Sequence, residues 1–328
     1  MALLEVQDLR VSYGDARGRR SVALAGLDLQ LAAGETLGIL GESGSGKSTL
    51  AATLLRMLPA NGSVDRGAIR FAGRELLHFD EREMEGIRGQ RMAMVFQEPS
   101  QALHPALRVA QQVRDVIGAH KKLRRDALRE KTARVLTAVF PKETERIARS
   151  YAHELSGGQR ARVLIAQAIC SDPELIVADE PTASLDAETQ MDILLLFRRL
   201  REELKLALIW ITHNPALLVG FADRVMVLYA GRVAEVGPTA QVLFSPRHPY
   251  TQALLGCLPP APGDGGGRQK SMLPAIPGEA PSAVADPGRC VFEPRCRERM
   301  DACILREPEM VRLSGAGEHS VSCIKYAG

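Results

Sequence analysis

The sequence predicts an α/β fold in which a mixed β-sheet carries a helical insertion and is followed by a small cysteine-rich C-terminal domain. Apolar segments typical of strands alternate along the chain with segments of helical spacing, and this alternation indicates an α/β core. A glycine-rich loop follows one strand and precedes a helix, which is the order that a phosphate-binding loop requires. Four of the six cysteines fall within residues 290–328.

The first 60 residues predict three strands, a loop and a helix. Alternating or apolar residues indicate strands at 3–9, 22–31 and 35–40. The third strand enters the glycine-rich loop GESGSGKS at 41–48, and residues 48–58 have helical spacing. Strand, loop and helix are therefore expected to form one unit.

The middle of the chain predicts a helical insertion followed by further α/β units. Residues 109–140 mix charged and apolar residues at spacings of three and four, which indicates helices. Strands are then expected at 174–179 and 206–212 on either side of a helix at 188–204, and a hairpin is expected at 224–237.

Composition divides the chain into three parts. We expect a nucleotide-binding domain over 1–258 with a helical subdomain at about 98–165, a linker rich in Pro and Gly over 259–288, and the cysteine-rich domain over 289–328. The 42 basic and 39 acidic residues give a net charge of +3, which argues against a nucleic-acid partner. No apolar run approaches the ~20 residues of a membrane span, and the N-terminus does not resemble a signal peptide, so a soluble, intracellular chain is expected.

The loop at 41–48 matches the pattern G-x-x-x-x-G-K-[ST]. Its glycines allow successive backbone N–H groups to face phosphate oxygens, and the following helix N-terminus adds its positive dipole end. Lys47 is expected to reach the β- and γ-phosphates, and the Ser48 hydroxyl is expected to bind Mg²⁺. The alternative, a chance match, is disfavoured by the strand–loop–helix context. The candidate ATP-binding residues of the loop are Gly41, Ser43, Gly44, Gly46, Lys47, Ser48 and Thr49.

A second element lies where an apolar strand ends in Asp179 and Glu180. A carboxylate at the C-terminal edge of a sheet lies where open α/β folds bind ligands. Asp179 is expected to hold Mg²⁺, and Glu180 is positioned to polarise an attacking water. The alternative is a strand that simply ends in exposed acids, and the nearby phosphate loop disfavours it.

A third element, LSGGQ at 155–159, begins a predicted helix. Ser156, Gly158 and Gln159 form an anion site typical of a helix start, although an ordinary helix cap would have the same sequence. One γ-phosphate does not need two such sites within one chain. We therefore expect that this second site serves a nucleotide on another subunit, in a dimer with ATP between the chains.

Together GESGSGKS, LSGGQ, LIVADE, SLDA and Thr212-His213 resemble the ATP-binding cassette (ABC) ATPases, in this order and spacing. The resemblance implies a P-loop NTPase fold and roles for further residues. Tyr13 would stack on adenine, Gln97 would contact Mg²⁺ or water and the membrane partner, and Asp186 would touch the opposite subunit. His213 would contact the γ-phosphate and Glu180 would be the general base, with Lys47 as the third catalytic residue. Asn214 follows His213 at a position where Asp is commoner in this family.

Further segments resemble the oligopeptide/dipeptide/nickel branch of ABC importers: 96–105, 245–255, 276–281 and the terminal cysteines. The resemblance implies an ATP-hydrolysing subunit that powers peptide import from the cytoplasmic face of the membrane. Its implied partners are two transmembrane permeases, a second similar ATP-binding subunit in a heterodimer, and an extracytoplasmic substrate-binding protein. A nickel or other small-solute importer, or a non-transport ABC ATPase, are the alternatives.

The clustered cysteines Cys290, Cys296, Cys303 and Cys323 allow three interpretations. Disulfides require an oxidising compartment, and structural zinc usually shows closer cysteine pairs than these. A four-cysteine iron–sulfur cluster tolerates wider spacing, and the resemblance implies a [4Fe–4S] segment, with Zn²⁺ as the alternative and reduced thiols as a third. The nearby His319 is expected at the surface.

Overall fold

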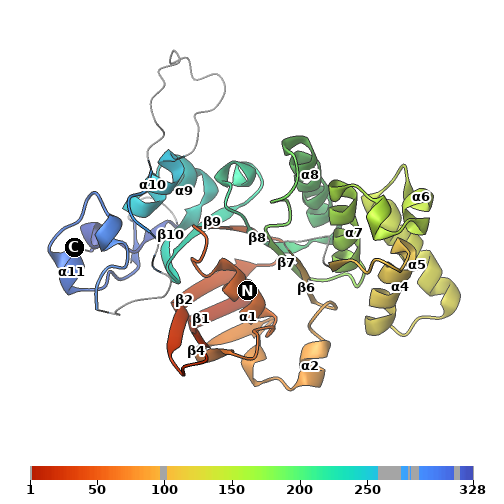
Figure 1. Ribbon diagram of the computed structural model, residues 1–328, viewed down its shortest axis with the longest axis horizontal. Coiled ribbons are helices and arrows are strands. Elements are labelled where there is room, and N and C mark those ends of the chain that lie inside the picture. The colour runs from red at the N-terminus through yellow and green to blue at the C-terminus, as the bar shows by residue number, and fades with distance from the viewer. Residues whose placement is uncertain are drawn as a thin grey trace, which may run out of the picture.

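The computed structural model describes residues 2–96, 102–257, 275–279, 281, 288–313 and 318–327, and it contains two sheets. The smaller sheet is antiparallel, with strand order β2-β1-β4-β5. Its strands are β1 (Ala2–Gly14), β2 (Arg20–Ala32), β4 (Gly62–Phe71) and β5 (Arg74–Glu75). Figure 1 shows this sheet beside the helix that follows the glycine-rich loop.

The larger sheet has eight strands in the order β11-β12-β10-β9-β3-β8-β7-β6. The strands from β9 to β6 in this order are parallel, and β10, β11 and β12 are joined by antiparallel pairs. Every residue of the central strands β3, β7 and β8 is buried, as expected of parallel strands covered on both faces. The strands are β3 (Thr36–Leu40), β6 (Met92–Val95), β7 (Leu175–Asp179), β8 (Ala207–Ile211), β9 (Arg224–Tyr229), β10 (Arg232–Pro238), β11 (Val311–Arg312) and β12 (Ser320–Val321).

The helices fall into three groups along the chain. Four consecutive helices between β6 and β7 gather at one end of the molecule (Figure 1): α4 (Val109–His120), α5 (Arg125–Val139), α6 (Thr144–Arg149) and α7 (Gly157–Ile169). The helices associated with the strands of the cassette are α1 (Lys47–Leu54), α2 (Glu81–Glu85) and α8 (Ala187–Leu204). The C-terminal part carries α9 (Thr239–Phe244), α10 (Pro249–Gly256) and α11 (Ala302–Leu305).

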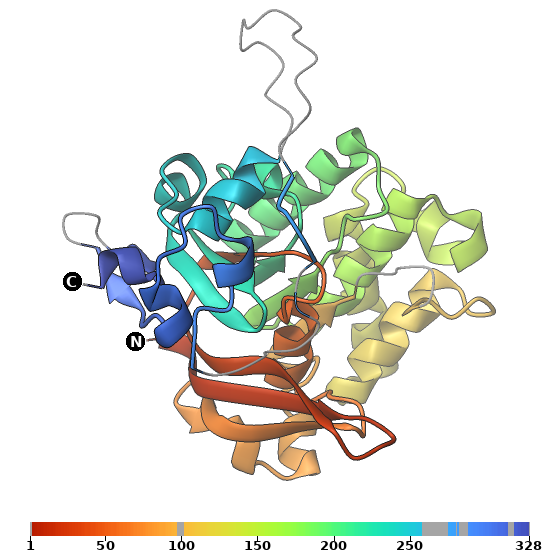
Figure 2. The same cartoon turned by 60° about the vertical axis from the view of Figure 1, so that its left-hand side comes forward.

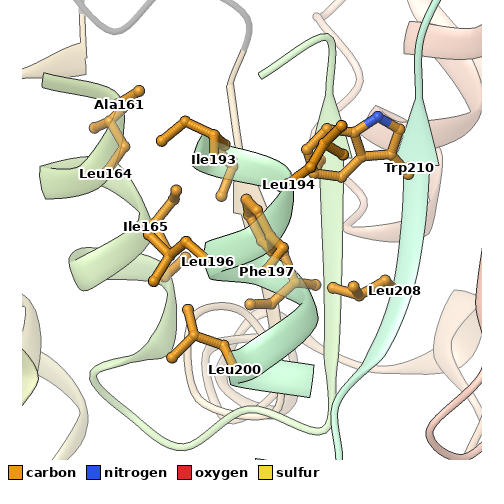
Figure 3. Packing of buried hydrophobic residues seen from close by; sticks show 14 of the residues in the cluster. Ala161, Leu164, Ile165, Ile193, Leu194, Leu196, Phe197, Leu200, Leu208 and Trp210 are labelled. Atoms are coloured by element: carbon orange, nitrogen blue, oxygen red, sulfur yellow. The ribbon is translucent and has the colours of Figure 1, made fainter. Parts of the chain in front are cut away.

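Two hydrophobic cores lie on the two sides of the larger sheet. One packs α1 and the smaller sheet against β3, and the other joins α4 to α8 with the opposite side. In the second core the side chains of α7 and β8 approach α8 from its two sides (Figure 3). Phe197 of α8 meets Trp210 of β8 edge to face with 5.1 Å between ring centroids, and both side chains are fully buried. This core fixes β7 and β8 beneath the helices.

The C-terminal residues extend the larger sheet, because β12 pairs with β10 and β11 pairs with β12. His319 is 2% exposed and its Nε2 lies 2.6 Å from the fully buried carboxylate of Glu235. The expected surface position of His319 is therefore wrong. Figure 2 shows the C-terminal segment next to the cassette. The predicted division into a domain, a linker and a cysteine-rich domain stays a prediction.

The expected strands at 3–9, 22–31, 35–40, 174–179 and 206–212 and the hairpin at 224–237 are confirmed. The helical run predicted over 109–140 is two helices, because the chain is extended at Lys121 and Arg124 between α4 and α5. The helix after the glycine-rich loop ends at Leu54, earlier than expected. No helix among the described residues combines the length and apolar character needed to cross a membrane.

Candidate nucleotide-binding site

The candidate site forms where three neighbouring parallel strands end. In the larger sheet β3, β8 and β7 lie side by side, so their carboxyl ends meet at one edge. The loop at 41–48 follows β3, His213 follows β8, and Asp179 and Glu180 end and follow β7. The strand order therefore brings together segments that are far apart in the sequence, at the edge where ligands bind in such folds.

Two glycines of the loop have no alternative on steric grounds. Gly46 caps α1 with φ of 104°, and a Cβ there would lie 2.8 Å from the Ala23 backbone oxygen. A Cβ on Gly41 would lie 2.3 Å from the Leu228 backbone oxygen. Only glycine permits these close approaches, so the loop stays wrapped around the N-terminus of α1 with its N–H groups available to an anion.

Lys47 is buried within the loop. Its Nζ donates to the backbone oxygens of Gly41 at 2.8 Å and Glu42 at 2.9 Å. Burial lowers the pKa of Lys47, and the negative charges of Glu180, Asp179 and Glu42 oppose that shift. The ammonium group thus lies among carboxylates and loop carbonyls, poised to exchange the latter for phosphate oxygens.

Asp179 and Ser48 fit a bound cation. Asp179 is 5% exposed, and its Oδ1 is buried without a hydrogen-bond partner. Burial is the main cause that raises the pKa of Asp179, and a hydrogen bond with Ser48 opposes it. A buried, unsatisfied carboxylate oxygen beside a hydroxyl is a donor set that suits Mg²⁺, which prefers oxygen ligands.

Glu180 and His213 are in contact. The His213 Nδ1 lies 3.1 Å from Glu180 Oε2, and the Glu180 side chain is largely buried while His213 is exposed. Glu180 has φ of 46°, an uncommon conformation for a residue with a side chain, and its N–H donates to the Ile211 oxygen at the end of β8. This left-handed turn points the carboxylate away from the strand direction and toward the loop.

One cavity of about 350 Å³ collects most of the predicted ATP-binding residues. The Tyr13 Oη lies 3.2 Å from Thr49 Oγ1, which sets the tyrosine at the rim of this cavity. Pro281 of the predicted linker also lines it. The predicted residues in its lining are Tyr13, Ser43, Gly44, Gly46, Lys47, Ser48, Thr49 and Glu180.

The predicted second anion site lies elsewhere. Ser156, Gly158 and Gln159 line a separate cavity with Thr189 and Arg162, and this cavity shares no lining residue with the first. The Ser156 hydroxyl accepts from the Gln159 N–H at 3.2 Å, and Gln159 Oε1 accepts from the Ser156 N–H at 3.1 Å. The helix start is therefore well formed, but it is not part of this chain's own ATP cavity.

Three further predicted positions have distinct environments. Asp186 caps α8 and accepts from the N–H of Thr189 at 2.9 Å and from its hydroxyl at 2.7 Å, which together lower the pKa of the aspartate. Asn214, the departure from the commoner Asp, caps the short helix Pro215–Leu218 through a hydrogen bond to Ala216. Gln97 lies outside the described residues.

Residues near the loop were also missed by sequence reasoning. Glu42 was treated as a variable position of the motif, yet its backbone and carboxylate are both held by residues of the C-terminal part, Tyr250 and Arg295. Tyr250 lies in the segment 245–255, whose sequence indicates only a resemblance to a transporter branch. No local sequence pattern indicates that this segment contacts the phosphate loop, because Tyr250 and Glu42 are 208 positions apart.

The four clustered cysteines are all described, and all four are free thiols. The Cys290 N–H donates to the Cys303 oxygen at 2.9 Å. Burial raises the pKa of Cys290 to about 11, and the charges of the other three cysteines add to the shift, so the thiols lie near one another. Yet no group of three or more Cys, His, Asp or Glu among the described residues is arranged to hold a metal ion. This arrangement does not support the predicted iron–sulfur site or its zinc alternative.

Comparison with known proteins agrees with the geometry of the site. The ABC transporter family matches residues 24–183, and the family described as "Oligopeptide/dipeptide transporter, C-terminal region" matches residues 234–303. The oligopeptide transport ATP-binding protein OppD of Escherichia coli (strain K12) is 41% identical over 307 residues, which covers 94% of this chain and 89% of OppD. OppD of Bacillus subtilis (strain 168) is 37% identical over 313 residues, covering 95% of this chain and 86% of that protein.

Solved structures give the same result for the fold. The dimeric ATP-binding cassette MJ0796, bound to ADP and Pi, superimposes with a TM-score of 0.64 at 26% identity, over 72% of this chain and 98% of that chain. The match extends the likeness from sequence motifs to the arrangement of the cassette itself. This chain therefore belongs to the ATP-binding proteins of the ABC transporter family, in the branch with the oligopeptide/dipeptide transporter C-terminal region.

Proposed function

We propose that this chain is the ATP-hydrolysing subunit of a peptide importer and that it acts through partner permeases. The observation that carries the proposal is the single cavity that unites Lys47, Ser48 and Glu180 at the ends of β3 and β7. The curated relatives named above are oligopeptide transport ATP-binding proteins, and a relative from Brucella melitensis biotype 1 that is 39% identical is described as a putative peptide import ATP-binding protein. These names favour peptides over nickel as the cargo.

The proposed chemistry is phosphoryl transfer to water. N–H groups of loop 41–48 other than that of Glu42, which donates to Tyr250, bind the phosphates, and Lys47 exchanges the Gly41 and Glu42 oxygens for the β- and γ-phosphates. Ser48 and Asp179 would hold Mg²⁺, which neutralises charge that develops on the phosphates. Glu180 accepts a proton from the attacking water, and His213 holds the Glu180 carboxylate in place.

We propose that a second, similar ATP-binding subunit completes the site. Support comes from the separation of the two cavities, because the cavity lined by Ser156 shares no lining residue with the cavity lined by Lys47. A helix start of this kind binds anions, so it would serve the nucleotide of a facing subunit. A heterodimer is the arrangement we propose, at the cytoplasmic face of the membrane, with two permeases and an extracytoplasmic substrate-binding protein.

A [4Fe–4S] cluster on Cys290, Cys296, Cys303 and Cys323 stays our proposal for the terminal cysteines, and Zn²⁺ stays the alternative. Its support is the donor set, four thiols that influence one another's charge, although their placement forms no ligand group. Anaerobic purification followed by visible absorption and iron and sulfide analysis tests it. A colourless protein with stoichiometric zinc would overturn the iron–sulfur assignment.

The importer proposal is tested by transport in proteoliposomes that contain this chain, two permeases, the second ATP-binding subunit and the binding protein. We expect a radiolabelled tripeptide to accumulate in an ATP-dependent manner, and the Lys47→Ala protein to abolish the accumulation. Accumulation of ⁶³Ni²⁺ without peptide uptake would replace the peptide assignment with the nickel alternative.

A further inference from the structure

Glu42, the second residue of the phosphate loop, forms an ion pair with an arginine from the C-terminal part of the chain. Arg295 Nη1 donates to Glu42 Oε2 at 2.7 Å, and Nη2 donates to Oε1 at 3.1 Å. The Arg295 side chain is 7% exposed and that of Glu42 is 26% exposed, so the pair is largely shielded from water. A bidentate arginine–carboxylate pair fixes direction as well as distance.

The backbone of Glu42 is held from the same side. Its N–H donates to the Tyr250 Oη at 2.9 Å, and the Tyr250 ring is fully buried. The rings of Tyr229 and Phe292 lie 4.5 Å and 5.3 Å from that of Tyr250. Burial raises the pKa of Tyr250, so its hydroxyl stays protonated near neutral pH.

Arg295 is itself held at each nitrogen. Its Nε donates to the Pro277 oxygen at 2.8 Å, and Nη1 also donates to the Tyr229 hydroxyl at 3.2 Å. Pro277 lies a few residues before Pro281, which lines the ATP cavity. The guanidinium thus ties the C-terminal segment, the end of β9 and the predicted linker to one residue of the phosphate loop.

We propose that Arg295 and Tyr250 are positioning residues for ATP binding, which act through Glu42 on the shape and charge of the phosphate loop. The inference rests on the proposed function, because it concerns the same ATP site. Glu42 carries a negative charge into a loop that must receive a polyanion, and its backbone oxygen accepts from Lys47 Nζ. Arg295 neutralises that charge, and Tyr250 holds the Glu42 N–H so that the loop keeps its curvature.

The charge of Glu42 should make a second substitution restore ATP affinity that a first one has lost. Without Arg295 the Glu42 carboxylate is left partly buried and uncompensated near the phosphates, and it repels them. Removing Glu42 as well removes the source of the repulsion. The double variant is therefore expected to bind ATP better than the single Arg295 variant, which an ordinary loss of packing would not produce.

The test is equilibrium binding of a fluorescent ATP analogue with Mg²⁺ to the full-length chain. We expect Arg295→Gln to weaken binding about tenfold, equivalent to ~1.4 kcal/mol. Glu42→Gln/Arg295→Gln should bind within about threefold of wild type, and so more tightly than Arg295→Gln alone, because the two residues form one interacting pair. Tyr250→Phe, which keeps the ring, should weaken ATP and ADP alike by about threefold through the lost hydrogen bond.

The matched control is Arg299→Gln. Arg299 forms an ion pair of 3.3 Å with Glu293 inside the C-terminal segment, and 59% of its side chain is exposed. It should leave ATP affinity unchanged. Thermal unfolding of each variant separates affinity from stability.

If Arg295→Gln lowers the melting temperature but keeps wild-type ATP affinity, the arginine is structural and the inference is wrong. If the double variant binds as weakly as Arg295→Gln, the charge argument fails. If the wild-type chain does not bind the nucleotide at all, the proposed function falls and this inference falls with it.

Discussion

Glu180→Gln separates ATP binding from ATP hydrolysis. The amide has the shape of the carboxylate and can keep the contact with His213 Nδ1, which is 3.1 Å from Glu180 Oε2. With Glu180 as the proposed general base, the variant is expected to lose that base and to keep the shape of the side chain. A positioned general base contributes about 10²–10⁴ in rate, so kcat should fall by that factor, or ~2.7–5.4 kcal/mol in activation free energy.

ATP affinity should not fall in the same variant. Glu180 is one of the negative charges that act on Lys47, and it lines the cavity that receives the triphosphate. Removing its charge removes a repulsion, so Kd should be unchanged or lower. Binding is measured on the full-length chain with a fluorescent ATP analogue, and hydrolysis by phosphate release from the assembled transporter.

The control is Glu202→Gln, the same chemical change at an exposed position near the end of α8. It should leave both Kd and kcat at wild-type values. Turnover by Glu180→Gln within threefold of wild type would show that another group activates the water. Loss of ATP binding in that variant would show instead that the carboxylate organises the loop, and the assigned role would be wrong.

Four further predictions follow from the same geometry. Asp179→Asn should abolish Mg²⁺-dependent ATP binding yet increase the unfolding free energy of the nucleotide-free chain by about 1 kcal/mol, because a buried carboxylate oxygen has no partner. Because burial raises the pKa of Asp179 in the folded chain, its ionisation should lower the unfolding free energy as pH rises from 3.8 through the folded pKa. Below 3.8 this destabilisation should be absent. Unfolding measurements at several pH values check this. Gly46→Ala should abolish ATP binding in the same fluorescence assay, because its Cβ meets the neighbouring strand at 2.8 Å. Phe197→Ala should lower the unfolding free energy by about 3–5 kcal/mol in urea denaturation, since the ring is fully buried against Trp210.

The sequence predicted those elements whose pattern is local. The strands Thr36–Leu40, Leu175–Asp179 and Ala207–Ile211 are fully buried, and such runs are mostly apolar, so their existence and nearly their limits could be recognised. Strand β4 (Gly62–Phe71) has no clear sequence pattern because each of its first six residues is only partly buried or exposed, and it joins the sheet through pairing with β1. The short strands β11 and β12 have two residues each, and no pattern can specify those.

The site divides in the same way. Gly46, Lys47 and Ser48 were found because phosphate binding depends on consecutive N–H groups, and consecutive positions leave a motif in the sequence. The contact between Glu42 and Arg295 spans 253 positions, and it depends on how the C-terminal part packs on β9 and the loop. The burial of His319 against Glu235 is likewise a product of pairing between β12 and β10. Neither could follow from local spacing.

The order of the strands bears on the proposal that a second subunit completes the site. The carboxyl ends of β3 and β7 place Lys47 and Glu180 in the lining of one cavity, and His213, which follows β8, contacts Glu180. The helix start at Ser156 caps α7, and it lines a cavity that shares no residue with the first. Rotation of α7 toward the chain's own loop is opposed by the core that packs its buried face against α8 and β8. A facing subunit can bring the same helix start to the phosphates without breaking that core, so the rigidity of this core is itself an argument for the paired arrangement.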